Sequence, residues 1–127
     1  MQNGKRKTGG IGLHNALAGL AMLLRSQRNA RIHAAATIAV VGLGILLRLS
    51  LGEWLWIGLA VGLVWMAEAM NTALELLADA AVPEEHSLVG RAKDAAAGAV
   101  LVAAATAAFI GALLLVPPLL QVIAGKG

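Results

Sequence analysis

Residues 95–125 read AAAGAVLVAAATAAFIGALLLVPPLLQVIAG and contain no charged side chain. A helix needs about 20 mainly apolar residues to cross a membrane, and the part that ends at Val116 reaches this length. Pro117 and Pro118 are expected to end the helix, because proline has no backbone N–H and its ring clashes with the preceding turn. This stretch and the polar residues before it predict a helix over 87–116 that starts in water and then crosses a membrane.

Two further membrane helices are predicted upstream, over 32–51 and 53–80. The first is broken only by His33 and Arg48, whose polar ends can reach the membrane interface. The second is apolar in its first half and acidic in its second half, and it carries the pattern Gly58-x-x-x-Gly62, which favours close helix packing. Residues 12–31 have leucines at helical spacing, which predicts an amphipathic surface helix and a linker. The chain, 1–127, is therefore expected to be a single all-α membrane domain.

The composition supports this class. The chain is 59% hydrophobic and 13% charged, whereas an average soluble domain is about a quarter charged. This excludes a soluble enzyme and a disordered chain. The absence of cysteine excludes disulfides and thiolate metal sites. The net charge of +3 comes with very few aromatic residues, so no nucleic-acid partner is expected.

The distribution of Lys and Arg predicts the orientation. Residues 1–31 hold six of them and the 83–94 loop holds Arg91 and Lys93, whereas the other side holds only Arg48 and Lys126. Basic residues gather on the cytoplasmic side of membrane proteins. The N-terminal region and the 83–94 loop are therefore expected in the cytoplasm. The Lys5-Arg6-Lys7 run is not followed by an apolar stretch, so no cleaved signal peptide is expected there.

The second half of the 53–80 helix carries a stripe of polar side chains: Glu68, Asn71, Thr72, Glu75 and Asp79. Spacings of three, four, seven and eleven residues put them on one face of a helix. Ionisable groups at membrane depth are costly and suggest a functional site. Three neighbouring carboxylates require a cation such as Lys, Arg or Mg²⁺. A polar seam that only holds helices together would not need three of them.

The following helix has a matching polar face with Arg91, Lys93 and Asp94. A short turn through Pro83-Glu84-Glu85-His86 would bring this face against the stripe, and its cations could bind phosphate. The chain contains neither a P-loop nor a protein-kinase signature, so any phosphate chemistry would not use a soluble nucleotide-binding fold.

These motifs resemble those of the prokaryotic diacylglycerol kinase family, which includes the undecaprenol kinases. The similarity rests on residues 68–79 (EAMNTALELLAD), 84–86 (EEH), 90–101 (GRAKDAAAGAVL) and 26–33 (SQRNARIH). The resemblance implies a homotrimer with three membrane helices and one surface helix per subunit, and active sites shared between neighbouring subunits. It also implies transfer of the γ-phosphate of ATP, with Mg²⁺, to a lipid hydroxyl.

The resemblance also implies roles for individual residues. Glu68 would be the general base, supported by Asn71. The remaining site residues would bind the nucleotide (Glu84, His86, Lys93, Asp94 and Asp79) or the metal (Glu75 and Gln27). An amide at Gln27, where well-known family members have a metal-binding Glu, is expected to weaken metal binding or leave the metal to acidic residues. The Arg31-Ile32-His33 run favours undecaprenol over diacylglycerol as the acceptor.

Two other functions stay open at this point. A buried Glu68 in a small Gly-rich protein also fits a proton-coupled transporter, although such carriers usually have aromatic-lined cavities. Gln27 fits a catalytically weak or inactive relative of the kinases.

Overall fold

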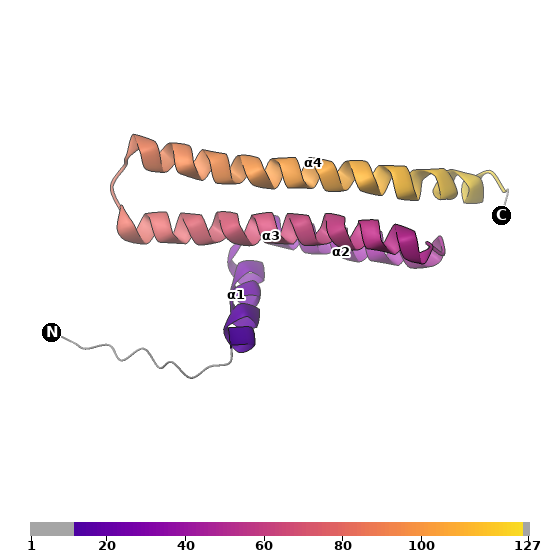
Figure 1. The fold of residues 1–127 in the computed structure, drawn as a ribbon, viewed down its shortest axis with the longest axis horizontal. Coiled ribbons are helices and arrows are strands. Elements are labelled where there is room, and N and C mark those ends of the chain that lie inside the picture. Colours follow the sequence, from indigo (N-terminus) through magenta and orange to yellow (C-terminus); the bar gives the residue numbers. More distant parts are fainter. Residues whose placement is uncertain (1–11, 126–127) are drawn as a thin grey trace.

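The computed structural model describes residues 12–125, which form four α-helices and no strand. They are α1 (Gly12–Ser26), α2 (Arg28–Leu46), α3 (Leu51–Ala81) and α4 (Ser87–Ile123). In Figure 1, α2, α3 and α4 run alongside one another and α1 projects away from them. The predicted all-α class is confirmed. Lys5, Arg6, Lys7 and Lys126, which entered the charge count, lie outside the described residues.

Three of the helices, α2, α3 and α4, are long and apolar enough to cross a membrane. Their outer surfaces carry large apolar side chains, such as Ile38 (73% exposed), Leu59 (61%) and Phe109 (66%). Soluble monomers rarely expose so much contiguous apolar surface, whereas a lipid environment accommodates it. The protein is therefore a multi-pass membrane protein, as predicted.

A tight turn joins α2 to α3. Arg48 has a positive φ of 55°, and the N–H groups of Leu49 and Arg48 donate to the carbonyls of Gly44 and Ile45. These two bonds form a Schellman motif, which ends α2 at Leu46 rather than at Leu51 as predicted. Ser50 then starts α3, because its side chain and that of Glu53 form a capping box.

Among the described residues, the most extensive packing between helices is that of α3 against α4, which run antiparallel and are joined by residues 82–86 (Figure 1). Small and β-branched residues are buried along it, including Ala60 and Val64 from α3 and Val100 and Ala103 from α4. Small side chains let helices approach closely, which is the main source of association in lipid. The short connection predicted between the two polar faces is therefore present.

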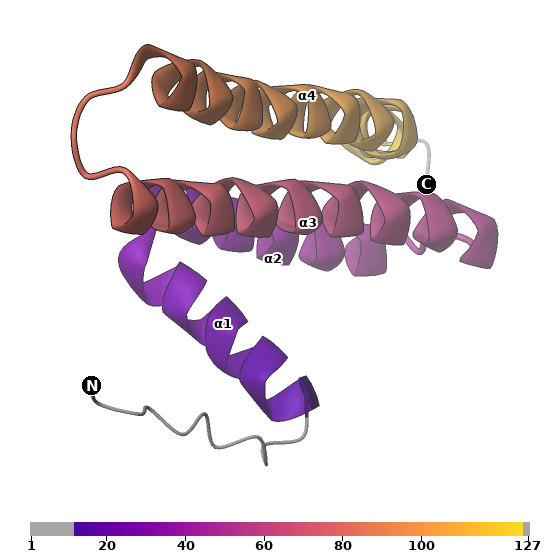
Figure 2. The same cartoon turned by 60° about the vertical axis from the view of Figure 1, so that its left-hand side comes forward.

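α1 runs obliquely to the other three helices, below their ends in the view of Figure 2. Leu23 (2% exposed) is its buried residue, whereas Leu13 and Leu17 are exposed. The leucine spacing therefore produced the expected helix, and its exposed leucines suit the apolar side of a membrane surface.

The predicted end of the last helix was wrong. Helix α4 does not end before Pro117 but continues through both prolines to Ile123. The fixed φ of proline matches helical geometry, so two prolines remove N–H donors without forcing the chain out of a helix. Gly58 and Gly62 do not mediate close packing within the described chain, because a Cβ added at either would meet no atom within 4 Å.

Candidate functional site

The buried part of the polar stripe lies in the middle of α3. Glu68 is 1% exposed, Thr72 2% and Asn71 8%. Burying an ionised carboxylate costs several kcal/mol unless it is paired, so a buried glutamate among apolar residues is not explained by folding alone. The deepest member of the stripe is therefore the strongest candidate for a functional group.

Three atoms of this cluster have no hydrogen-bond partner in the described part of the chain: Glu68 Oε2, Asn71 Oδ1 and Thr72 Oγ1. Most buried polar atoms in proteins are paired, and those that are not require an explanation. Here they form one cluster over a little more than one helical turn. Such a cluster is suited to receive polar groups from a ligand or from another copy of the chain.

Glu68 faces α2, where His33 approaches it. The His33 Nε2 atom lies 3.7 Å from Glu68 Oε2, and the two side chains are 18% and 2% exposed. The sequence did not identify His33 as a site residue, because its position at the start of a membrane helix was explained by the interface. The signal that could have identified His33 is its place near the start of a membrane span, from which a histidine can face the acidic stripe.

Asn71 and Glu75 are joined one turn further along α3. The amide Nδ2 of Asn71 donates a 3.3 Å hydrogen bond to Glu75 Oε1. Glu75 is half-buried, so it is accessible to a ligand while one of its oxygens is held. Asn71 therefore positions Glu75, and the Asn71 oxygen remains free.

The end of the stripe meets α4 through an ion pair. Lys93 Nζ contacts Asp79 Oδ1, which confirms that the two polar faces come together at this position. A cavity of about 590 Å³ lies beside the pair, and its polar lining is Asp79, Glu84, Glu85, His86, Ser87 and Lys93. Glu85 and Ser87 belong to the predicted turn and polar face, but the sequence analysis gave neither a role in the site. Proximity to the predicted turn was the signal that could have included them.

The other predicted residues differ in how far they join this cavity. His86 is the N-cap of α4, and its Nδ1 accepts a hydrogen bond from Leu88 N (3.3 Å). Asp94 is exposed and does not line the cavity. Gln27 is the half-buried N-cap of α2 and makes no capping hydrogen bond with its side chain. The structure therefore assembles Asp79, Glu84, His86 and Lys93, and leaves Asp94 outside.

The described residues contain no group of three or more acidic or histidine side chains that could hold a metal ion. The oxygens of Glu75, Asn71 and Gln27 are nevertheless of the hard type that Mg²⁺ prefers. Mg²⁺ is usually bound by one or two carboxylates and by substrate phosphates, rather than by a protein cage. The donor set therefore fits a magnesium ion that arrives with a nucleotide.

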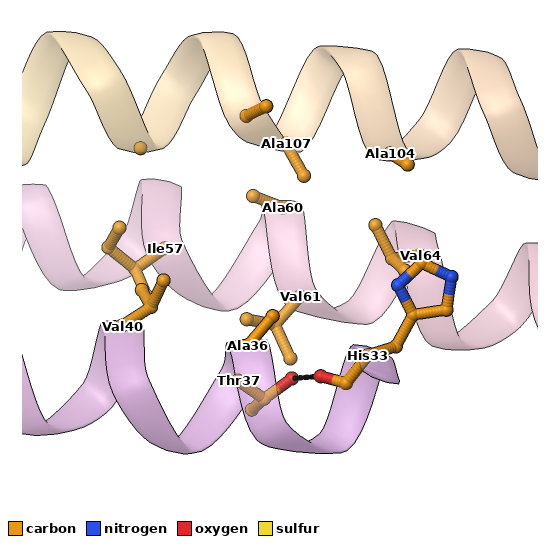
Figure 3. Close-up of a pocket in the computed structure, with 12 residues that line it drawn as sticks. His33, Ala36, Thr37, Val40, Ile57, Ala60, Val61, Val64, Ala104 and Ala107 are labelled. Atoms are coloured by element: carbon orange, nitrogen blue, oxygen red, sulfur yellow. Dashed lines mark hydrogen bonds between the residues drawn. The ribbon is translucent and has the colours of Figure 1, made fainter. Parts of the chain in front are cut away.

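A second cavity of about 350 Å³ lies between α2, α3 and α4. Figure 3 shows it lined by small and branched apolar side chains, with the His33 ring directed from α2 towards α3 beside Val64. One turn beyond Val64, α3 carries Glu68. His33, which lines this cavity, is thus also the neighbour of the buried Glu68.

Comparisons with known proteins agree on one family. A family model described as prokaryotic diacylglycerol kinase matches residues 14–115. The chain is 44% identical over 95 residues to a Bacillus subtilis (strain 168) protein named undecaprenol kinase, and the aligned residues cover 75% of this chain and 77% of that protein. It is 41% identical over 112 residues to a Synechocystis sp. protein named diacylglycerol kinase, which covers 87% of this chain and 64% of that protein. No solved structure matches this chain.

Proposed function

This chain belongs to the prokaryotic diacylglycerol kinase family and is a lipid kinase, and we propose that it transfers the γ-phosphate of ATP to the hydroxyl of undecaprenol or diacylglycerol. The observation that carries the proposal is the buried Glu68, which lies against His33, a residue that lines an apolar cavity. A lipid hydroxyl attached to an apolar chain suits this combination.

Glu68 acts as the general base. One carboxylate oxygen takes the proton of the lipid hydroxyl while the hydroxyl oxygen forms a bond to the γ-phosphorus. The bond between that phosphorus and the bridging oxygen breaks, and ADP leaves with the bonding electrons. Catalysis of this reaction depends mainly on positioning and on neutralising charge, so a small membrane site is sufficient.

Glu75 and Gln27 hold the Mg²⁺ ion that accompanies ATP. When bound, the ion neutralises negative charge on the phosphates. Asn71 contributes by fixing one Glu75 oxygen through the hydrogen bond described above. Because Gln27 supplies an amide instead of a carboxylate, we expect weaker metal binding than a glutamate would give.

The cavity between α3 and α4 receives the nucleotide. Lys93 is the cation that contacts phosphate, because its ammonium group has three donors and only one of them is needed for Asp79. Glu84 and Asp79 supply acceptors for the hydroxyl and amino groups of the nucleoside, and His86, whose Nδ1 already accepts from Leu88 N, offers its Nε2–H as a donor. Asp94, one residue beyond Lys93 and outside the cavity, joins the site from a neighbouring subunit.

We further propose a homotrimer with shared active sites in the bacterial inner membrane, with the N-terminal region in the cytoplasm. Glu68 and Asp79 are eleven residues apart, which is about 16 Å along a helix, so Lys93 on Asp79 is far from the base of its own chain. Mixing inactive Glu68→Gln and Lys93→Met subunits should therefore restore part of the activity. No recovery in mixed oligomers would argue for sites within single chains.

The test is transfer of radiolabelled phosphate from MgATP to undecaprenol and to diacylglycerol, offered separately in lipid micelles. We expect labelled lipid from the wild type and none from Glu68→Gln. Glu53→Gln is the matched control: it changes another glutamate of α3, and glutamine also serves at this capping-box position. Activity that survives in Glu68→Gln would contradict the mechanism.

An inactive wild type that folds correctly would contradict the proposal in a second way. If Gln27→Glu then created activity, the chain would be a catalytically weak relative. If neither protein labelled lipid but proteoliposomes showed proton-driven efflux without ATP, the chain would be a transporter.

A further inference from the structure

We propose that His33 is a positioning residue for the base: its Nε2–H donor holds the Glu68 carboxylate in the orientation that reaches the lipid hydroxyl. This inference rests on the proposed function, in which Glu68 takes the hydroxyl proton. It adds a residue from α2, whereas the polar stripe belongs entirely to α3.

The first argument is the contact itself. The 3.7 Å between His33 Nε2 and Glu68 Oε2 is an ion-pair distance, and this oxygen has no hydrogen-bond partner in residues 12–125. A small rotation of either side chain would bring the atoms to hydrogen-bond distance, which is about 2.7–3.2 Å. Contacts at catalytic sites are often long without ligand and shorten when substrate binds.

The second argument is that other donors are already engaged elsewhere. Lys93 pairs with Asp79, about 16 Å further along α3. Arg31, on the same helix as His33, donates to the backbone carbonyl of Arg25. On α3 itself, Asn71 donates to Glu75. Among the described residues, His33 is therefore the one basic side chain paired with Glu68.

The third argument is that the backbone at His33 is held in register with α3. The Thr37 hydroxyl donates to the His33 carbonyl oxygen (2.7 Å) and accepts from Trp65 Nε1 (3.2 Å). Trp65 precedes Glu68 by three residues, so this link joins the two helices within one turn of the pair. The hydroxyl-to-carbonyl bond and the direction of the imidazole are visible in Figure 3.

The position of the ring explains what the contact would achieve. His33 and Val64 lie at the same end of the apolar cavity, and Glu68 follows Val64 by one turn. A carboxylate in an apolar wall can adopt several rotamers, and an N–H donor on one oxygen selects one of them. The second oxygen is then directed at the acceptor hydroxyl, which is a matter of geometry rather than of substrate affinity.

The test compares three substitutions at His33 in the full-length protein. Glutamine can place an N–H near the position of Nε2, whereas the shorter asparagine and alanine cannot. We expect His33→Ala and His33→Asn to lower kcat about 10- to 100-fold, as for other residues that orient a reacting group, with the KM for ATP changed less than about 2-fold. His33→Gln keeps an N–H donor, so its kcat should stay within about 5-fold of the wild type.

The control is Ile38→Ala, which changes a 73% exposed residue of the same helix and should leave both constants unchanged. If His33→Ala fails to fold, the comparison between glutamine and asparagine, which are both polar, still decides the question. Equal kcat values for these two variants, or an unaffected kcat in His33→Ala, would overturn the role of His33. An inactive wild type would instead overturn the proposed function, so the two failures are distinguishable.

Discussion

Replacing Gly44 by alanine tests how tightly the turn between α2 and α3 is packed. Gly44 is buried near the C-terminal end of α2, and a Cβ added there would lie 2.8 Å from Trp54 Cη2 and 3.1 Å from Leu49 Cδ1. Ordinary carbon contacts are about 3.5–4.0 Å, so the indole must move by roughly 0.7 Å or more. Gly42 lies two residues earlier on the same helix, and a Cβ added there would have no atom within 4 Å.

The expected magnitudes follow from these distances. Overpacking of this kind costs about 1–3 kcal/mol, and alanine in a helix returns about 0.5–1 kcal/mol relative to glycine. Gly44→Ala should therefore lower the free energy of unfolding by up to roughly 2.5 kcal/mol after this gain. Gly42→Ala should change it by no more than about 1 kcal/mol, in the stabilising direction.

The assay is reversible unfolding of the purified protein in mixed detergent, followed by tryptophan fluorescence, which also reports directly on Trp54. Phosphate transfer measured well below the unfolding midpoint should be the same in both variants, because neither glycine lines the polar cavity. Equal stability of the two variants would refute the packing argument. A loss confined to Gly42→Ala would show that this face contacts another copy of the chain.

Three more substitutions test single features of the fold in the same unfolding assay. Arg48→Gly should stabilise the protein by up to about 1 kcal/mol, because a non-glycine residue with a φ of 55° is strained; a loss would show that the arginine side chain is needed. Ser50→Ala should cost about 1 kcal/mol by removing the capping box, and no loss would mean that α3 starts without it. Thr72→Val should raise stability by about 1 kcal/mol, since it replaces a buried, unpartnered hydroxyl with an apolar group of the same shape. Destabilisation would show that a group outside this chain pairs with Thr72.

The membrane helices could be predicted because their signal is local. A run of about 20 apolar residues has few alternatives in a bilayer, so the three spans were found from composition and length. Their ends could not be predicted as well. The end of α2 depends on a positive φ at Arg48, a residue type that rarely adopts it, and α4 passes through Pro117 and Pro118. Both outcomes depend on backbone geometry that residue preferences do not predict: a Schellman motif at a non-glycine residue, and a helix that continues through two prolines.

The site divides in the same way. The stripe from Glu68 to Asp79 follows from helical spacing alone, and so does its contact with Lys93 once the connection between α3 and α4 is known to be short. The approach of His33 could not be predicted, because α2 is apolar on most sides and its sequence does not reveal which face turns towards α3.

The two ends of the polar stripe on α3 contact different helices, and this arrangement bears on how such a small protein could phosphorylate a lipid. Glu68 lies against His33 of α2, which lines an apolar cavity, whereas Asp79 and Lys93 lie where α3 and α4 enclose a polar cavity. The lipid acceptor requires apolar surroundings. ATP, the proposed phosphate donor, is a polyanion and requires polar surroundings with cations. A single helix about 45 Å long spans both environments, since α3 has 31 residues at about 1.5 Å each. In the proposed homotrimer the base of one chain and the Lys93 of a neighbouring chain serve one site, so the two environments meet between subunits and the γ-phosphate is the only group that has to enter both.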